Sequence, residues 1–357
     1  MLDRTFASRD FSESFGERFP HLFSDDAIHQ HHLVCSDGVI QSCVGCYAFP
    51  ALLHGVALRV CGIGQVATIP EARGGGLMSR LLDTALAERG DCDLFWLHGE
   101  RRRYARVGFA PGGCVVSGVV AAHLVRDAAG SGAAGTSRAL DLRQDAALIA
   151  RTLAAAPFSL VLERASQLRL LGGKQVHGLT DGEACILLDA PGRLVWAMHG
   201  PAPSVIRLIR HHLETRSLTP AASTPLTLQA DPWDQLSLAV VRSLSGDTTT
   251  RATASLRIGR LLPLLQAWAA AHPPPPQASL RPWTIDGGAA GCVRIACAGR
   301  QWRIAEGTLP ADVRLEGSEL SELVFGFVPL GAWNLEVDQA ARYLLPLQFA
   351  IPWGYGL

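Results

Sequence analysis

Val66-Ala67-Thr68-Ile69-Pro70-Glu71-Ala72-Arg73-Gly74-Gly75-Gly76-Leu77-Met78 is the stretch of sequence that decides the fold. An apolar run ends at a proline, three glycines follow, and apolar residues at helical spacing begin directly afterwards. Glycines let a backbone approach a ligand closely, and the first N–H groups of a helix have no partner inside it. The helix dipole favours an anion at that end. The stretch therefore predicts a strand, a glycine loop and a helix N-terminus able to hold a pyrophosphate, with Arg73 adding charge.

Two better-known phosphate loops do not fit this stretch. A P-loop would close with Lys-Ser/Thr, which is missing here. A dinucleotide-binding G-x-G-x-x-G loop would be followed by a second strand ending in Asp or Glu, and none follows at the right distance. A glycine-rich turn between two core elements remains as the structural alternative.

The sequence around the glycine loop predicts an alternation of strands and helices. The expected order is a helix within residues 8–24, a hairpin of His32–Cys35 and Val39–Phe49, an extended run Val56–Ile69 with a turn at 61–64, a helix Leu77–Ala87 and a strand Asp93–Leu97. Asp37-Gly38 between the first two apolar runs is a strong hairpin signal. We therefore expect an α/β (α+β) fold with a mixed central sheet.

Beyond residue 126 the chain divides again. Residues 127–137 are small and linker-like, so we expect domains at 1–126, 138–248 and 249–357. The second domain is expected to hold a strand pair, Ala184–Leu188 and Leu194–His199, and a helix Pro203–Leu213, but it has no glycine loop. The third is expected to be small and α+β, with helices Ile258–His272, Ser318–Phe325 and Ala340–Leu345 and extended runs Cys292–Ala298 and Gln301–Ala305. Pro273–Pro276 ends the first of these helices and is interpreted as a stiff spacer.

Composition narrows the function classes. The chain has 357 residues, 48% of them hydrophobic and 18% charged, with a formal net charge of zero, so it can bury large cores and shows no basic surface for nucleic acid or membrane. No signal peptide or spanning run is apparent, and nine scattered cysteines do not form a secreted disulfide framework. We expect a cytoplasmic protein. Lys174 is the only lysine, which is typical of a GC-rich bacterial genome.

Two motifs resemble those of the GNAT acetyltransferases. Glu71-Ala72-Arg73-Gly74-Gly75-Gly76 resembles motif A, Gln/Arg-x-x-Gly-x-Gly/Ala, with Glu71 as a departure, and residues 104–109, Tyr-Ala-Arg-Val-Gly-Phe, resemble the family's Tyr-x-x-x-Gly-Phe. The resemblance implies a GNAT fold and acetyl-CoA as co-substrate. It also implies that the backbone of Val66, Ala67 and Thr68 pairs with the pantetheine arm.

Tyr104 is the candidate general acid, because a phenol can protonate the thiolate that leaves in acetyl transfer. The alternative is a tyrosine that packs its ring under the sheet. The attacking amine must lose a proton, and Asp93, His98 and Glu100 lie near the end of one strand as candidate bases. Glu100 precedes three arginines, which favours a solvated charged stretch.

The length and three-part layout are similar to the Eis-type (enhanced intracellular survival) branch. That resemblance implies a catalytic GNAT domain, a degenerate GNAT-like domain and a sterol-carrier-protein-like C-terminal domain. It implies a base in the terminal carboxylate of Leu357 and a homo-oligomer, since such proteins form hexamers. The acetyl-CoA contacts it implies are Val66, Ala67, Thr68, Arg73, Gly74, Gly75, Gly76, Leu77, Met78, Gly99 and Glu100.

The expected function is therefore acetyl-CoA-dependent N-acetylation of a primary amine, on a small molecule or peptide, by direct transfer in a ternary complex. No cysteine has an activated setting that would favour a covalent route. The alternatives are a non-catalytic acyl-CoA- or lipid-binding scaffold and the transfer of a longer acyl group. Asp25, Asp26 and Glu100 could attract a cationic acceptor.

No metal is expected. Cys43 and Cys46 have zinc-like spacing without a second pair, and on a strand their side chains point to opposite faces, which favours buried structural cysteines. His29, His31 and His32 are interpreted as a polar strand entry, and His211-His212 as surface residues.

Overall fold

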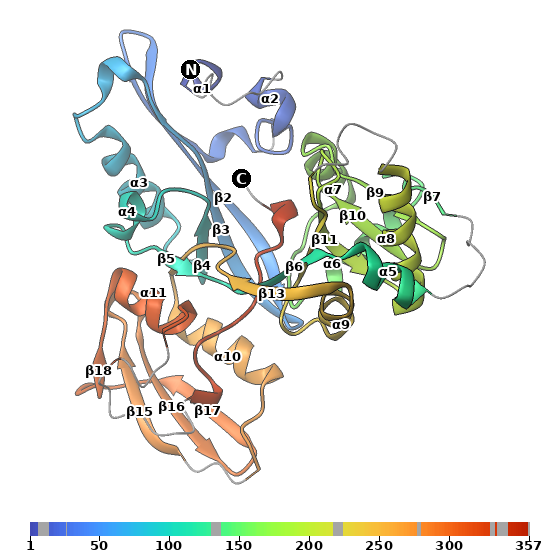
Figure 1. Ribbon diagram of the computed structural model, residues 1–357. Coiled ribbons are helices and arrows are strands. Elements are labelled where there is room, and N and C mark those ends of the chain that lie inside the picture. Colours follow the sequence, from blue (N-terminus) through green and yellow to red (C-terminus); the bar gives the residue numbers. More distant parts are fainter. Residues whose placement is uncertain are drawn as a thin grey trace. The chain divides into compact units, whose positions relative to one another are not determined.

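The computed structural model describes residues 1–5, 14–25, 27–129, 137–216, 224–276, 280–328, 333 and 342–355 (Figure 1). The chain forms two compact units: Met1–Gly113 with Ala254–Gln348, and Cys114–Thr253 with Phe349–Gly356. Each unit is built from segments that are far apart in the sequence.

The first unit is organised around a mixed sheet. Its strand order is β1 (His31–Ser36), β2 (Val39–Leu53), β3 (Val56–Thr68), β4 (Leu94–Leu97), β14 (Ala254–Ile258) and β5 (Ala110–Gly112). Neighbours are antiparallel except β3 and β4, which are parallel. Asp37 and Gly38 both have positive φ, at 52° and 74°, as a two-residue hairpin turn requires, so the predicted hairpin is confirmed.

Helices cover one face of this sheet (Figure 1). α3 (Leu77–Glu88) has its apolar residues at helical spacing and buries Leu81, Leu82, Ala85 and Leu86. These side chains pack on Val44, Cys46, Cys61 and Ile63 of β2 and β3, together with Tyr104 of α4 (Arg101–Ala105). Burying this apolar stripe is what holds the glycine loop, which lies directly before α3, against the sheet.

The sequence prediction was wrong at several places in this unit. Cys61–Gly64 are not a turn but lie inside β3, because they pair with β2 and three of them also pair with β4. The predicted helix at Ile258 begins only at Leu261, where α10 (Leu261–Ala271) starts, because Ala254–Ile258 form β14. Within residues 8–24 the described helix is α2 (Phe15–Arg18), closed by a Ser14–Glu17 capping box, and residues 6–13 lie outside the description.

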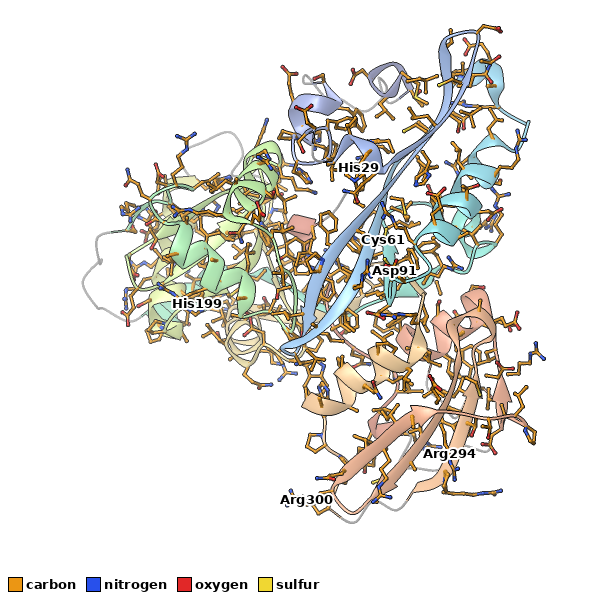
Figure 2. All side chains as sticks on the ribbon, turned by 180° about the vertical axis from the view of Figure 1, so that it is seen from behind. His29, Cys61, Asp91, His199, Arg294 and Arg300 are labelled. Carbon is orange, nitrogen blue, oxygen red and sulfur yellow. The ribbon has the colours of Figure 1, made fainter. Side chains whose placement is uncertain are left out.

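The rest of the first unit is a small α+β region. Its sheet has the order β17 (Gln301–Glu306), β16 (Cys292–Ala298), β15 (Leu280–Asp286) and β18 (Val313–Arg314). α10 packs on β16, β17 and β3, and α11 (Gly317–Phe325) packs on β5 and β14. Arg300 lies at the turn between β16 and β17, at the tip of this sheet (Figure 2). The predicted helix Ala340–Leu345 lies partly outside the described residues.

The second unit contains a second mixed sheet. Its strand order is β13 (Ser245–Arg251), β6 (Val115–Val120), β12 (Thr227–Ala230), β11 (Leu194–His199), β10 (Cys185–Leu188), β9 (His177–Thr180) and β7 (Arg138–Ala139). One core joins this sheet to α5 (Ala122–Ala129), α8 (Ala202–Arg216) and α9 (Gln235–Leu244). A second core joins Leu187 and Trp196 to α6 (Ala146–Ala154) and α7 (Arg164–Gly173). The strand residues alternate between the two cores, as expected for a sheet covered on both faces.

Strand pairing runs across two of the predicted domain boundaries. Val115–Val120, N-terminal to the linker, pair with β12 and β13 of the second sheet. Ala254–Ile258, beyond residue 249, pair with β4 and β5 of the first sheet. Each of these strands pairs with edges of the other strands that would otherwise be exposed. The division at 1–126, 138–248 and 249–357 stays a prediction. Among the described helices, none is long and apolar enough to cross a membrane.

Candidate active site

The candidate site lies where β3 and β4 separate. Val60–Ile63 pair in parallel with Leu94–Leu97, and β4 ends there. β3 continues to Thr68 while pairing on its other side with β2, through Ser42↔Thr68 and Cys43↔Ala67. Within the described strands, residues 64–68 therefore have no β4 partner, and their backbone groups on that edge can pair with a ligand.

A bulge accompanies this separation. The β2–β3 register shifts between Cys43 and Gly45, and Gln65 has a left-handed φ of 48°, which is uncommon for a residue with a Cβ. Gln65 is nearly fully buried, and its Oε1 accepts a hydrogen bond from the Tyr47 hydroxyl at 2.6 Å. The same hydroxyl lies 2.8 Å from His31 Nε2. Gly45 has no side chain that would collide with the Tyr47 ring.

Burial is the largest influence on the pKa values of His31 and Tyr47 in this group of hydrogen-bonded side chains. It lowers the pKa of His31, so the imidazole is neutral at neutral pH, and it raises the pKa of Tyr47 far above its usual range. The hydrogen-bonded side chains of His31, Tyr47 and Gln65 are therefore neutral and support the bulge.

The glycine loop lies directly beyond the separated edge. Pro70–Ala72 form one short 3-10 turn, and Gly74 and Gly76 have φ values of 85° and 70°. A Cβ at either glycine would meet nothing within 4 Å, and both glycines line the cleft described below. Gly76 is the N-cap of α3 and no side chain caps the helix there, which leaves its first amides available to an anion.

These elements enclose a cleft of about 630 Å³. This volume is in the range of cofactor sites. Its lining residues are Thr5, Val66, Ala67, Thr68, Ala72, Arg73, Gly74, Gly76, Leu77, Met78, Ser79, Arg103 and Arg106. Of the predicted cofactor contacts, Gly75, Gly99 and Glu100 are not in this lining. The structure brings the others together in one place.

Arg103 and Arg106 were missed as site residues by the sequence analysis, which interpreted residues 101–103 as a solvated stretch. Both line the cleft, Arg103 from within α4 and Arg106 from the residue directly after it. An Arg106 guanidinium N–H donates to Ser79 Oγ in the first turn of α3. Arg73 holds the loop by donating from Nε to the Thr68 carbonyl at 3.3 Å. The i, i+3 spacing of Arg103 and Arg106 was the available signal, because it puts both on one helix face. Three guanidiniums and open helix amides suit a polyanionic phosphate ligand.

Tyr104 is a buried residue whose exposed fraction is 6%. Its ring lies edge-on to Phe109 at 6.4 Å, and Gly99 makes room for it, since a Cβ there would lie 2.5 Å from Tyr104 Cε2. Gly108 has a φ of 91°. Tyr104 is not among the residues that line the cleft. The Tyr-x-x-x-Gly-Phe motif thus has a packing role, and the acid role of Tyr104 stays a prediction.

The carboxylates considered as bases have structural partners. Asp93 is buried, accepts from Arg59 N at 2.8 Å and pairs with Arg260, whose Nε and Nη2 lie 2.9 and 2.7 Å away. Glu100 is exposed and lies 3.7 Å from Arg103. Leu357 and Asp26 lie outside the described residues.

The discounted cysteines and histidines have structural roles. Cys46 belongs, with Val44, to the apolar core under α3, and Cys43 is not part of that core. The two cysteines therefore face opposite sides of the strand, as predicted. Cys46 Sγ lies 3.2 Å from Cys61 Sγ, and Cys61 lies on β3 in the first sheet (Figure 2). His212 is half-buried rather than on the surface and lies 2.9 Å from the Gly192 carbonyl. In the described ranges no three His, Cys, Asp or Glu residues converge as metal ligands.

Residues 4–112, which lie in the first unit, match the model of the acetyltransferase (GNAT) domain. This match supports acyl-CoA-dependent acetyl transfer as the general class of reaction. No curated protein matches the sequence.

Solved structures are similar over nearly the whole chain. A probable N-acyltransferase of unknown function from Enterococcus faecalis V583 has a TM-score of 0.69 at 15% identity, over 98% of this chain and 93% of that one. A GCN5-related N-acetyltransferase from Kribbella flavida has a TM-score of 0.68 at 18% identity, with the same coverage. Eis1 from Mycobacterium abscessus has a TM-score of 0.60 at 14% identity, over 96% of each chain. At these identities the likeness establishes the fold, and the predicted mixed GNAT fold is confirmed.

Proposed function

We propose that the chain is an acetyl-CoA-dependent N-acetyltransferase that acts on a primary amine of a small molecule or peptide by direct transfer in a ternary complex. The observation that carries this proposal is the unpaired edge of residues 64–68 ending in a glycine loop with open amides. A scaffold without a ligand has no need of a bulged strand, two left-handed glycines and three arginines around one cleft.

The parts of the cleft suggest a division of roles. The amides of residues 74–78 would hold a pyrophosphate, and Arg73, Arg103 and Arg106 would neutralise its charge. The free main-chain groups of Val66, Ala67 and Thr68 would pair with the amides of a pantetheine arm. When bound, acetyl-CoA supplies an activated thioester. Holding it beside the amine supplies much of the rate through proximity.

Tyr104 is the proposed acid and Leu357 the proposed base, and both assignments rest on the family resemblance. For Tyr104 the support is its place on α4, the same segment that lines the cleft with Arg103 and Arg106. For Leu357 the support is the resemblance alone. The close, buried pairing of Asp93 with Arg260 makes Asp93 a poor alternative base, whereas Glu100, exposed and 3.7 Å from Arg103, stays an alternative.

The test is acetyl-CoA turnover over a panel of aminoglycosides, polyamines and peptide amines, with wild type, Tyr104→Phe and Tyr343→Phe. We expect Tyr104→Phe to lower kcat by about 100-fold, because general acid catalysis is typically worth that much or more. The dissociation constant for acetyl-CoA should stay within about twofold of wild type, since a hydroxyl contributes little to uniform binding. Tyr343 is exposed, so Tyr343→Phe is the matched control.

The scaffold alternative gives a different result. Acetyl-CoA binding without turnover of any amine would favour an acyl-CoA-binding scaffold. Absence of both binding and turnover would contradict the proposed enzyme and favour a scaffold that does not bind acyl-CoA. Equal turnover by wild type and Tyr104→Phe would remove Tyr104 from the mechanism while leaving the reaction class intact.

A further inference from the structure

The second sheet has an opening of the same kind as the first. β11 pairs in parallel with β12 only through Leu194↔Thr227 and Val195↔Leu228. Beyond these pairs, β11 continues from Trp196 to His199 and pairs only with β10 among the described strands. The two parallel strands therefore separate, as β3 and β4 do in the first sheet.

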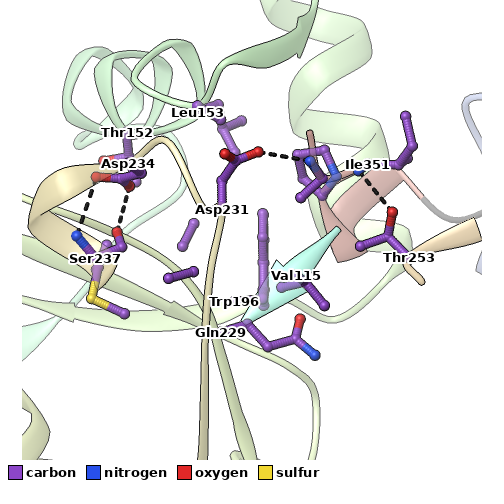
Figure 3. A pocket seen from close by; sticks show the side chains of 16 residues that line it. Val115, Thr152, Leu153, Trp196, Gln229, Asp231, Asp234, Ser237, Thr253 and Ile351 are labelled. Atoms are coloured by element: carbon purple, nitrogen blue, oxygen red, sulfur yellow. Dashed lines mark hydrogen bonds between the residues drawn. The ribbon is translucent and has the colours of Figure 1, made fainter. Parts of the chain in front are cut away.

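In the second unit this opening holds a segment of the same chain, residues 349–355. Its main chain is hydrogen-bonded by side chains of the opening: Ala350 N donates to Asp231 Oδ2 at 2.7 Å and Ile351 N donates to Thr253 Oγ1 at 3.1 Å (Figure 3). The Phe349 carbonyl accepts from Cys114 N at 2.9 Å. Three successive residues are thus held through backbone groups.

The side chains of the segment are equally well accommodated. Phe349 is fully buried and stacks on Phe158 with ring centroids 5.6 Å apart. Ile351 and Tyr355 each have an exposed fraction of 2%, and the Tyr355 hydroxyl bonds to the main chain of Leu160. Gly354 lies against Trp196, where a Cβ would be 2.7 Å from the indole. A close approach of this kind requires glycine.

The segment leaves little space. The cavity lined by Trp196, Gln229, Asp231 and Ile351 holds about 50 Å³, enough for ordered water and far less than a cofactor arm needs. Asp231 connects the segment to β12. It comes directly after β12, is buried, and also accepts from Trp233 N at 2.8 Å, so its carboxylate joins the strand end to the segment.

We propose that the opening between β11 and β12 is a docking site for residues 349–355 of this chain, with Asp231 as the positioning residue, and that it takes no acyl-CoA. The second unit retains the GNAT strand separation but uses it to hold an extended piece of polypeptide. This inference goes beyond the proposed function and stands on contacts that are independent of it.

The first test is hydrogen–deuterium exchange of the full chain, resolved at the amides of Ala350 and Ile351. Asp231→Ala should raise exchange at Ala350 by about tenfold, as expected for the loss of a buried hydrogen bond. Asp231→Asn keeps an oxygen acceptor of the same shape and should restore most of the protection. Amides of β10 in the same unit should stay protected in both variants, which separates release of the segment from unfolding.

Unchanged exchange at Ala350 in Asp231→Ala would overturn the positioning role. An equal rise over β10 and residues 350–351 would also overturn it, because Asp231 would then only stabilise the unit as a whole. If Asp231→Asn failed to restore protection, an oxygen acceptor of the same shape would not be sufficient to hold Ala350. This result would contradict the proposed role of Asp231 as the positioning residue.

The second test is the stoichiometry of CoA binding to the full chain by calorimetry. One CoA per chain is expected, and two would overturn the claim that the second opening takes none. A value of zero would contradict the proposed function of the first unit, while the exchange experiment would still decide the docking.

Discussion

In both sheets two parallel strands separate, but the segments beside the two openings differ. In the first, residues 69–76 lie between the end of β3 and the start of α3 and supply glycines, open amides and Arg73. In the second, only Gly200 and Pro201 lie between β11 and α8. Pro201 has no N–H to offer an anion. The first opening stays a cleft, whereas the second is filled by the chain itself.

If the second opening takes no acyl-CoA, as proposed, a separated pair of parallel strands is not by itself a cofactor site. Unpaired strand edges need partners, and either a ligand or a piece of polypeptide can provide them. What distinguishes the two openings is the glycine loop with its open helix amides and the arginines beside it. The predictions that follow change one of these features at a time, in order of the expected effect on acetyl-CoA affinity.

The glycine loop should give the largest effect. Gly76→Val places a branched side chain at a φ of 70° in the cleft, and we expect acetyl-CoA affinity to fall by about 100-fold, or about 2.7 kcal/mol. Gly55→Val is the matched control, because Gly55 has a φ of 82°, lies in the β2–β3 turn and also has open space around it. Calorimetry should find the control unchanged. Equal losses in both variants would mean that backbone strain, not occupation of the cleft, is measured.

The arginines should come next. Arg103→Gln and Arg106→Gln should each weaken acetyl-CoA binding by about tenfold, which is what loss of a charge-assisted contact to phosphate typically gives. The dependence of affinity on salt should become shallower, since fewer charges are screened. Arg102→Gln on the same helix is the control, because Arg102 is exposed and does not line the cleft. A loss as large with Arg102→Gln would indicate a general charge effect.

The support of the bulge should have a smaller effect. Tyr47→Phe removes the donor to Gln65 Oε1 and should destabilise the first unit by about 1–3 kcal/mol, because a buried acceptor loses its partner. Acetyl-CoA affinity should fall only about threefold, since the loop itself is intact. Comparing Gln65→Gly with Gln65→Ala tests the left-handed φ of 48°. The glycine variant should be the more stable of the two in chemical denaturation, and the reverse order would mean that the strain is absent.

Asp231→Asn should leave acetyl-CoA affinity unchanged and alter only the pH dependence of stability. Burial raises the pKa of Asp231 to about 7, with Asp234 adding to the rise and hydrogen bonds from Ala350 and Trp233 opposing it. The folded state therefore keeps a proton that the unfolded state loses near pH 4. This contribution is complete below pH 4, is lost as pH rises toward 7, and is absent above it.

The measurement is the denaturation midpoint of the full chain from pH 5 to 8. Asp231→Asn should flatten the fall in stability over this range, and Asp37→Asn, in the exposed β1–β2 turn, is the control. An unchanged slope in Asp231→Asn would mean that Asp231 does not titrate in this window.

The sequence by itself determined the first opening well because its signals are local. A proline stop, three glycines and an apolar helical stripe occur within residues 66–88, so strand, loop and α3 could be predicted from nearest neighbours in the chain. Val66, Thr68, Arg73 and Gly76 line the cleft, and their contacts with acetyl-CoA, which the family resemblance implies, stay a prediction. Arg103 and Arg106 were missed because their role depends on how α4 meets α3, which spacing alone does not fix.

Only the tertiary structure decided how distant segments combine. β14 completes the first sheet from beyond residue 250, and residues 349–355 fill an opening formed by β11 and β12. Such pairings have no local signature, because any apolar extended segment could satisfy an exposed strand edge and the choice is made by packing over the whole unit. Asp231 illustrates this, since this acidic residue after a short strand is buried and accepts a hydrogen bond from Ala350, which lies more than a hundred residues further along the chain.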